Sequence, residues 1–351
     1  MIETAKEAAG SDAVLAVMSG SFVQRGEPAA FDKWTRAEEA VKNGVNLVVE
    51  LPAVFACSSA AYFASGGVQV LEGLGCVDRL AFGSESGELE GLRRAADFLD
   101  RREEELHREI SAFVKEGMSY PRARQAAAEK LGGGVEPEAI SEPNNILAVE
   151  YLRHVKKMEP WTVKRQGSGH HVSASQIRAE LAAADPEEWN RRQQAYWQMA
   201  AAAVLRADRS QLEQILSAGG GLSDKLKKEI RYASSVEELL DRLKTKAYTH
   251  TRVRRMLAQT LLGIERRSVE EARPYIRVLA FDQRGAAVLR EVRKRGCAGL
   301  PLITNVNRGL RDFPEIRETL EKDILAADLH NLLLSRDLYA CSDYVMQVRR
   351  V

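Results

Sequence analysis

Short apolar runs alternate with helical patterns along the first half of the chain. Mostly apolar runs that stop at a Gly, Ser or Pro predict buried strands at residues 13–18, 46–51 and 77–82. Between them, residues 33–43 and 58–74 have the apolar spacing of helices, and each ends just before or at an Asn or Gly. This β-α-β-α-β order predicts an α/β fold with a parallel sheet, in which ligands lie beyond the carboxyl ends of the strands.

The remainder of the chain has mainly helical patterns. Residues 88–130 are charged and helical in spacing, 145–157 predict a helix and 161–165 a strand. From residue 185 onward the pattern is mostly helical, with extended segments at 274–281 and 300–304. We therefore expect a parallel sheet followed by a mostly α-helical C-terminal part.

A chain of 351 residues is too long for one small core. We expect two domains, an α/β domain over residues 1–180 and a mostly helical one over 181–351. With 45% hydrophobic and 29% charged residues, the composition is that of a soluble globular protein and excludes a disordered or collagen-like chain.

Membrane, secretory and metal signals are not found in this sequence. No apolar run approaches the length of a membrane span, and the first residues have no basic start followed by an apolar block. The four cysteines lie far apart without a CxxC pair, so we expect free thiols in a reducing cytoplasm and no metal site.

The formal net charge of +1 hides an asymmetry between the two halves. Residues 181–351 hold 30 Lys and Arg against 23 Asp and Glu, and residues 1–180 hold 21 against 27. Within the second half, residues 242–295 hold 15 basic and only 5 acidic side chains. This excess favours a polyanionic partner for the second half.

A Gly-rich segment, Ser19–Pro28, follows the first predicted strand directly. Ser19 and Gly20 would let a ligand approach the backbone, and Arg25 can contact a phosphate or carboxylate in a bidentate manner. Lys33 adds a further cation nearby. The alternative is a surface loop of ordinary turn residues, and the pattern alone leaves both open.

Two more segments follow predicted strands or open a predicted helix. Gly83, in the FGSESG segment, marks a possible close approach of a ribose or adenine, or else a plain strand-to-helix turn. Asn144 and Asn145 open a helix in SEPNN, where capping is the more frequent role of Asn. A functional Asn would instead bind an adenine edge or a substrate carbonyl through its amide.

A second cationic, Gly-rich segment begins at Lys164 and continues into SASQIR. Backbone N–H groups at a helix start near Ser175, together with Arg165 and Arg178, would form an anion-binding cradle. The adjacent His170 and His171 have no third ligand at metal spacing, which disfavours a metal role.

The basic region contains a helix-like stretch in which Tyr248 and His250 stand beside several cations. Aromatic rings next to cations are typical of RNA-binding surfaces, although a solvated basic face is the common alternative. The candidate RNA contacts are Lys244, Lys246, Arg252, Arg254 and Arg255.

Taken together, these segments resemble the tRNA(Met) cytidine acetate ligase family over nearly the whole chain. The segments that carry the resemblance are SGSFVQRGEPA, DKWTRAEEA, VVELP, FGSESG, PNNILAVEYL, VKRQGSG and KAYTHTRVRRML. The resemblance implies a Rossmann-like nucleotidyltransferase domain and a helical tRNA-binding domain. It also implies activation of acetate by ATP as acetyl-adenylate, followed by transfer of the acetyl group to N4 of the wobble cytidine of elongator tRNA(Met).

The resemblance also implies roles for individual residues. It places Gly83, Asn144 and Arg165 at ATP-binding positions, and Ser175 and Arg178 in a phosphate-contacting motif. Residues 246–255 would face the tRNA. Mg²⁺ would arrive with the nucleotide, because the sequence has no evident carboxylate cage.

The chain departs from the family pattern at its start. Family members begin with a strand and a phosphate loop that carries an HxGH motif, and no HxGH occurs in these 351 residues. Those histidines would stabilise charge on the ATP phosphates, so their loss should lower the rate. We expect a start assigned too far downstream, with a truncated and inactive form as the alternative. Two other functions stay open: a nucleotidyltransferase for a small acceptor, and an RNA-binding protein without catalysis.

Overall fold

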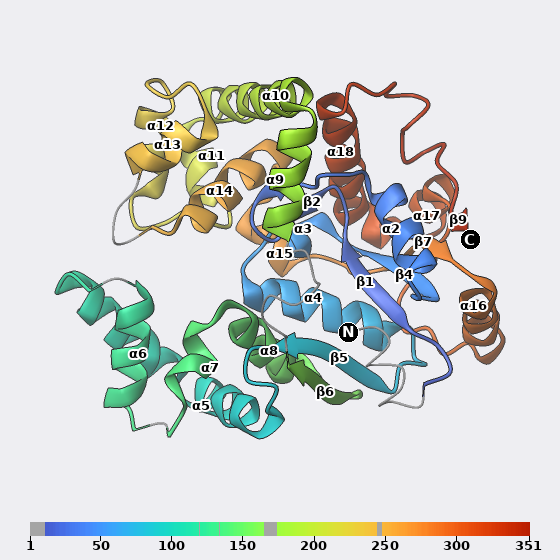
Figure 1. Ribbon diagram of the computed structural model, residues 1–351, viewed down its shortest axis with the longest axis horizontal. Helices are drawn as coiled ribbons and strands as arrows, with labels where there is room; N and C mark the ends of the chain where they lie inside the picture. The colour runs from blue at the N-terminus through green and yellow to red at the C-terminus, as the bar shows by residue number, and fades with distance from the viewer. Residues whose placement is uncertain (1–10, 119, 133, 165–173, 244–247) are drawn as a thin grey trace.

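The computed structural model describes residues 11–118, 120–132, 134–164, 174–243 and 248–351 (Figure 1). Within them, the chain has the predicted mixed α/β architecture, with sheets in the part drawn at the centre of Figure 1 and helices around them. Most of the second half is helical, as the pattern predicts.

A mixed sheet forms the centre of the molecule. Strands β1 (Leu15–Ser19) and β4 (Leu47–Leu51) are parallel, and β7 (Ile276–Phe281) is antiparallel to β4. The short strands β8 (Leu302–Ile303) and β9 (Arg349–Arg350) are parallel to β7. All residues of β4 are buried, which explains its almost wholly apolar sequence.

The third predicted strand is found as β5 (Arg79–Ser84), but it does not join the first two. Among the described residues it pairs with β6 (Glu159–Lys164), in parallel and in a separate two-stranded sheet. The expectation of one sheet from the three strands is therefore wrong in this detail. Local apolar patterns predict that a strand exists, but they do not encode its partner, here about 80 residues further along the chain.

Helices of the first half flank these strands. They are α2 (Lys33–Lys42), α3 (Ala53–Ala56), α4 (Ala60–Gly73), α5 (Leu89–Lys115), α6 (Tyr120–Lys130), α7 (Pro137–Ser141), α8 (Pro143–His154) and α9 (Ala174–Ala184). Helix α2 begins at a side-chain cap: the Asp32 carboxylate accepts hydrogen bonds from the backbone N–H groups of Trp34 and Thr35. The helices predicted over residues 33–43, 58–74 and 145–157 are confirmed as α2, α4 and α8.

Helices of the second half are α10 (Pro186–Arg206), α11 (Arg209–Gln214), α12 (Leu222–Glu229), α13 (Val236–Leu243), α14 (His250–Leu262), α15 (Arg266–Glu270), α16 (Gln283–Arg295), α17 (Val306–Asp312), the 3₁₀ helix η1 (Pro314–Ile316) and α18 (Arg317–Leu333). In Figure 1, helices α10 to α14 form a group at the upper left, α15 lies near the centre, and α16 to α18 lie on the right. The extended segments predicted at 274–281 and 300–304 are found as β7 and β8.

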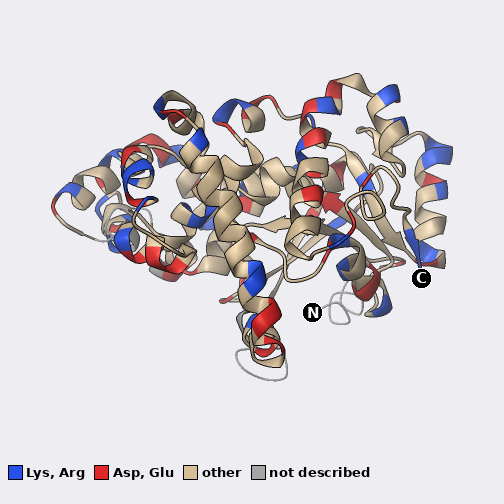
Figure 2. Cartoon of the chain, turned by 90° about the horizontal axis from the view of Figure 1, so that it is seen from above, with Lys and Arg blue, Asp and Glu red and all other residues tan. Residues whose placement is uncertain are grey.

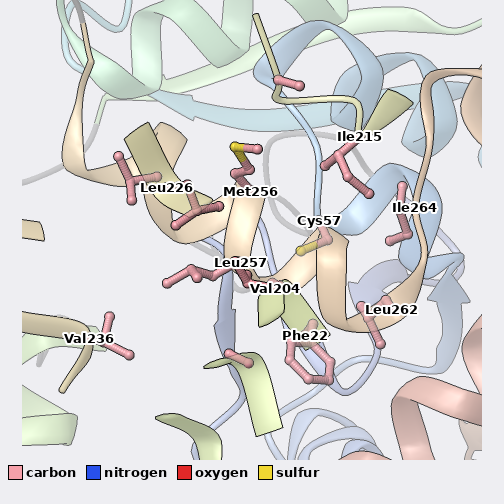
Figure 3. Close-up of a cluster of buried hydrophobic side chains, with 14 of the residues drawn as sticks. Phe22, Cys57, Val204, Ile215, Leu226, Val236, Met256, Leu257, Leu262 and Ile264 are labelled. Atoms are coloured by element: carbon pink, nitrogen blue, oxygen red, sulfur yellow. The ribbon is translucent and has the colours of Figure 1, made fainter. Parts of the chain in front are cut away.

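The largest hydrophobic cluster joins both halves of the chain. Phe22 and Leu51, from the α/β part, pack in one cluster with Val204, Leu257 and Leu262 from the helices (Figure 3). Since β7, β8 and β9 also enter the first sheet, the halves share both a core and a sheet. The division into domains at residue 180 stays a prediction.

Candidate functional site

A carboxylate at the end of β5 binds the start of helix α8. The Glu85 carboxylate accepts hydrogen bonds from the Asn144 backbone N–H at 3.2 Å, the Asn144 side-chain amide at 2.6 Å and the Asn145 backbone N–H at 2.8 Å. In return the Asn145 side-chain oxygen accepts from the Glu85 N–H at 2.9 Å. Because the preceding Glu142 makes no side-chain cap, Glu85 supplies the acceptors that the helix N-terminus requires.

The segment with Gly83 lies against the end of β6. Gly83 is paired with Val163 in the parallel ladder, and the Ser84 hydroxyl contacts the Thr162 hydroxyl at 2.7 Å. Gly87 has φ +72°, and a Cβ there would lie 2.6 Å from the Lys164 Cβ. The FGSESG, PNN and VK segments, predicted as separate motifs, therefore converge beyond the carboxyl ends of β5 and β6.

The segment after β1 is closely packed. A Cβ at Gly20 would lie 2.2 Å from the Glu50 carboxylate, so only glycine fits this position. The Arg36 guanidinium donates to the carbonyl oxygen of Ser19 at 3.1 Å and to that of Gly20. Ser19 ends β1, and Arg25 is exposed in the turn that follows. The segment is closely packed at Gly20 and turns at residues 24–26, so both alternatives for it stay open.

Glu27 connects this segment to two distant helices. It lies in the hairpin of β2 (Phe22–Val23) and β3 (Glu27–Pro28). Its carboxylate is 2.6 Å from the Arg254 guanidinium on α14 and 3.9 Å from that of Arg178 on α9. The Tyr196 hydroxyl donates to the Gly26 carbonyl oxygen at 3.3 Å. Three predicted motifs, around residues 19–28, 175–178 and 244–255, thus meet at one carboxylate.

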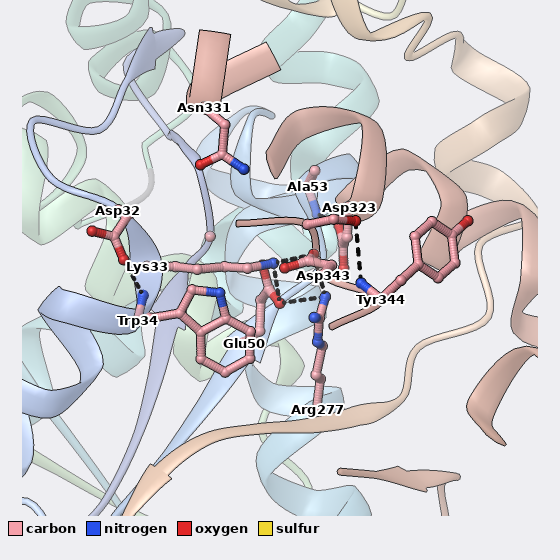
Figure 4. Close-up of polar contacts among 12 residues, drawn as sticks. Asp32, Lys33, Trp34, Glu50, Ala53, Arg277, Asp323, Asn331, Asp343 and Tyr344 are labelled. Atoms are coloured by element: carbon pink, nitrogen blue, oxygen red, sulfur yellow. Dashed lines mark hydrogen bonds and ion pairs between the residues drawn. The ribbon is translucent and has the colours of Figure 1, made fainter. Parts of the chain in front are cut away.

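Lys33 lies in a buried ion-pair network (Figure 4). It is 1% exposed, and its ammonium donates to both Glu50 carboxylate oxygens, at 2.8 and 3.0 Å, and to Asp343 at 2.7 Å. Arg277 bridges the same two acids, at 3.1 Å from Glu50 and 2.8 Å from Asp343. The Lys33 ammonium has three N–H donors and three acceptors within this network, so its role is structural. The geometry does not support its predicted contact with phosphate or substrate.

Charge pairing sets the ionisation of this network. Burial alone would raise the pKa of Asp343, but Arg277 and Lys33 hold it below its usual value. The pKa of Asp323 is raised, first by burial and then by the Glu50 charge. Asp323 accepts a hydrogen bond from the Tyr275 hydroxyl and another from the Ala53 N–H, at 2.6 Å. The network therefore connects β4, β7, α3, α18 and the C-terminal segment.

The arginines of α14 have three different environments. Arg252 donates to the carbonyl oxygens of residues 217–219 at 3.0–3.2 Å, and its guanidinium lies 5.6 Å from the Tyr248 ring centroid. Arg254 is paired with Glu27, as above, and lies 3.6 Å from Glu237. Arg255 is partly buried, and no ion pair holds it among the described residues.

The basic excess of residues 242–295 does not form one surface. Figure 2 shows Lys and Arg interspersed with Asp and Glu over most of the chain. Several of these cations pair with acids one helical turn away, as Arg242 does with Glu238 at 2.7 Å and Arg295 with Glu291 at 2.6 Å. Helices α14 and α16, which carry much of the excess, lie on different sides of the molecule (Figure 1).

Several predicted site residues cannot be placed. Arg165, Lys244 and Lys246 lie outside the described residues, and of Ser175 only the backbone of α9 is described. The roles predicted for Gly83, Asn144, Arg178, Ser19, Gly20 and Arg25 stay predictions, but the structure places these residues in the two converging clusters above.

The described residues include neither a metal-binding cluster nor a membrane-spanning helix. No three His, Cys, Asp or Glu side chains there come together as a group that could hold a metal ion. No helix in the described part of the chain is long and apolar enough to cross a membrane.

Sequence reasoning missed the carboxylates that organise the site. Glu85 and Glu27 both lie within segments that the sequence marks as candidate sites. The functional interpretation of those segments rests on their glycines, amides and cations, and not on the two acids. Their partners, Asn144, Arg178 and Arg254, are 59, 151 and 227 positions away. The available signal was an acid within a segment that follows a predicted strand, and this signal is weak.

Comparison with known proteins shows the general class to which this chain belongs. A family model described as HIGH Nucleotidyl Transferase matches residues 1–342. The chain also has the fold of a solved structure, Thermotoga maritima TmcAL bound with alpha-thio ATP, with a TM-score of 0.87 at 28% sequence identity. This match covers 100% of our chain and 95% of the Thermotoga chain. The same protein in its apo form matches with a TM-score of 0.87 and 27% identity.

Curated relatives narrow the class to one family. A tRNA(Met) cytidine acetate ligase of Thermoanaerobacter sp. (strain X514) is 34% identical over 378 residues, covering 98% of our chain and 94% of its own. The enzyme of that name from Syntrophotalea carbinolica is 36% identical, covering 95% and 90%. The chain therefore belongs to the tRNA(Met) cytidine acetate ligase family, a family of ligases within the HIGH nucleotidyl transferases.

Proposed function

We propose that this protein is an ATP-dependent ligase that acetylates N4 of the wobble cytidine of elongator tRNA(Met). Family membership supports the proposal, and so does the single observation that carries it: the FGSESG, PNN and VK segments converge beyond β5 and β6, with Glu85 binding Asn144. Ligands of α/β proteins occupy this end of the sheet. The Thermotoga relative, with the same fold, was crystallised with an ATP analogue.

The nucleotide site in this proposal lies between the two converging clusters. Gly83 and Asn144 would contact the nucleoside, and Arg165, Ser175 and Arg178 the phosphates. The N-terminus of α9 would supply backbone N–H groups to the phosphates. Ser19, Gly20 and Arg25, at and after the end of β1, would line the opposite side of the site. Mg²⁺ would enter with the ATP phosphates.

The proposed reaction has two steps. A carboxylate oxygen of acetate attacks the α-phosphorus of ATP, forming acetyl-adenylate and releasing pyrophosphate. The N4 amine of cytidine then attacks the acetyl carbonyl carbon and releases AMP, and the amine loses a proton. Cations that stabilise the phosphates during the first step accelerate it, because negative charge accumulates on the leaving pyrophosphate. We assign no catalytic base.

We propose that tRNA binds the helices of residues 181–351, the predicted second domain. A cavity of about 380 Å³ opens there, between α11 and α12, and Arg209, Lys228 and Arg231 line it with Tyr232, which is 60% exposed. An exposed aromatic ring among cations suits an unpaired base with its phosphate. Affinity for tRNA should then fall steeply as the salt concentration rises. We place the enzyme in the cytoplasm, where its substrates are.

Two other functions compete with this proposal. A nucleotidyltransferase for a small acceptor would not need a basic helical surface. A non-catalytic RNA-binding protein would bind tRNA without binding ATP. ATP binding, measured by calorimetry, distinguishes the non-catalytic RNA-binding protein from the ligase and from the nucleotidyltransferase.

Acetylation of an elongator tRNA(Met) transcript tests the proposal itself. We would compare the 351-residue protein with a fusion that carries an HxGH strand and loop ahead of Met1, with ATP and acetate present. Acetylation of N4 by the fusion, dependent on both substrates, would support the ligase. A fusion that binds ATP and tRNA but acetylates no transcript would overturn it.

A further inference from the structure

One arginine of α14, Arg255, has a buried Nε without an acceptor among the described residues. The Nε of Arg255 is inaccessible to solvent and has no hydrogen-bond acceptor among the described residues. No carboxylate in the described ranges forms an ion pair with its guanidinium, and burial lowers its pKa, with the neighbouring Arg252 adding to that effect. Burying an arginine without an anion costs free energy, so the position calls for an explanation.

The neighbours of Arg255 do not supply that anion. The titratable group that acts to raise the Arg255 pKa is Cys57, which is fully buried with its own pKa raised to about 12, so the thiol is neutral. The backbone of Gly26 lies against the Arg255 backbone, where a Cβ on the glycine would be 2.2 Å from the arginine nitrogen. Cys57 ends α3, shortly after β4, so Arg255 lies at the carboxyl side of the sheet.

The two adjacent arginines make the contrast clear. Arg252 donates three hydrogen bonds to carbonyl oxygens, and Arg254 pairs with Glu27 at 2.6 Å. Both have structural partners, whereas Arg255 has none in the described part of the chain. A generic solvated basic face would not leave a buried Nε without an acceptor.

We propose that Arg255 binds an oxyanion of a small-molecule substrate, a carboxylate or a phosphate oxygen, between α14, the Gly26 turn and the end of α3. A planar guanidinium binds either oxyanion in a bidentate manner. A buried Nε suits a small anion better than an RNA backbone, which needs an exposed surface. The identity of the anion rests on the proposed function, which offers two sources: the carboxylate of acetate and the phosphates of ATP.

Thermal unfolding of the full 351-residue protein tests this inference without relying on acetylation. Wild type and Arg255→Met are compared with no additive, with sodium acetate, with ATP and with inorganic pyrophosphate, at constant ionic strength. At least one of these anions should raise the wild-type midpoint, and Arg255→Met should reduce the affinity for that anion about tenfold or more. Without additive, Arg255→Met should unfold at or above the wild-type midpoint, because an unpaired buried charge is removed.

Two further variants complete the comparison. Arg255→Lys keeps the charge but loses the planar fork, so it should recover only part of the anion-dependent shift. Arg267→Met, which removes an exposed arginine paired with Glu271 on α15, should keep the full shift. If acetate shifts the midpoint and ATP and pyrophosphate do not, Arg255 binds the carboxylate. If ATP and pyrophosphate each shift the midpoint and acetate does not, Arg255 binds the phosphates.

Three results would overturn the inference: no anion-dependent shift in the wild type, an unchanged shift in Arg255→Met, or a lower midpoint of that variant without additive. A loss of tRNA affinity with unchanged anion affinity would make Arg255 an RNA contact and would also overturn it. Failure of the acetylation assay with the anion shift intact would overturn the proposed function and leave this inference standing.

Discussion

The Glu27 carboxylate and the Arg254 guanidinium, 227 positions apart, form an ion pair of 2.6 Å. The pair joins the hairpin after β1 to α14 and is about three-quarters buried, with 20% and 25% of the side chains exposed. Arg178 of α9 approaches the same carboxylate at 3.9 Å. The segment that follows the first strand is therefore attached to the helices that the sequence assigned to a different domain.

Replacing Glu27 by Gln should reduce the free energy of unfolding by about 1–3 kcal/mol, because two cations lose a partly buried partner. Urea denaturation of the two proteins measures this difference. Glu38→Gln is the matched control: its pair with Lys42 on α2 is exposed, so the expected loss is under about 0.5 kcal/mol. Equal losses in both variants would show that the Glu27 contact contributes no more than a surface pair.

The buried network of Figure 4 gives a larger expected effect. Lys33→Met leaves Glu50 and Asp343 with Arg277 as their main cation, so the free energy of unfolding should fall by about 3–5 kcal/mol. The exposed Lys42→Met is the control and should change it by less than about 0.5 kcal/mol. A stable Lys33→Met protein that has lost ATP affinity would instead support the phosphate contact predicted from the sequence.

The sequence was informative where structure is local. The apolar runs predicted β1, β4 and β5 and the helices between them, because strand and helix periodicity depends on neighbouring residues. The same patterns could not predict that β7 pairs with β4 in the antiparallel direction, since the paired residues are 227–234 positions apart. Nor could they separate β5 from the first sheet.

The candidate site was predictable only in part, for the same reason. Gly20 and Gly83 were singled out because small residues after a strand permit close approach, and Gly20 indeed has no room for a side chain. Lys33 looked like an available cation, but its burial depends on Asp343, 310 positions later. The unpaired state of Arg255 depends on how α14 packs against α3, which no local pattern contains.

Glu85 should affect nucleotide binding through Asn144. In Glu85→Gln the Asn144 and Asn145 N–H groups lose a charged acceptor, so the start of α8 should lose about 1–2 kcal/mol of stability. Affinity for ATP should then fall about tenfold if Asn144 contacts the nucleotide, as calorimetry would measure. Glu88→Gln, an exposed acid three residues later in the chain, is the control and should leave both quantities unchanged. Unchanged ATP affinity in Glu85→Gln would argue against a nucleotide site at this end of β5.

His330 should make stability depend on pH in the acidic range. The ring is 1% exposed, its Nε2–H donates to the Ala29 carbonyl oxygen at 2.7 Å, and burial lowers its pKa to about 4. The unfolded chain binds a proton near pH 6.5, so the neutral buried ring contributes stability above that pH, which is lost as the pH falls towards 4. The full difference is about 3 kcal/mol.

Asp323 changes the stability with pH in the opposite direction. Its pKa is raised in the folded protein, so as the pH falls the folded chain binds a proton there before the unfolded chain does. The two contributions oppose each other in the wild type, so the His330 contribution must be measured as a difference. The free energy of unfolding of wild type minus that of His330→Gln should decrease between pH 6.5 and 4, since Asp323 is present in both proteins. His107→Gln, which removes an exposed histidine on α5, is the surface control. A constant difference for His330→Gln over this range would mean that folding does not lower the pKa of the ring.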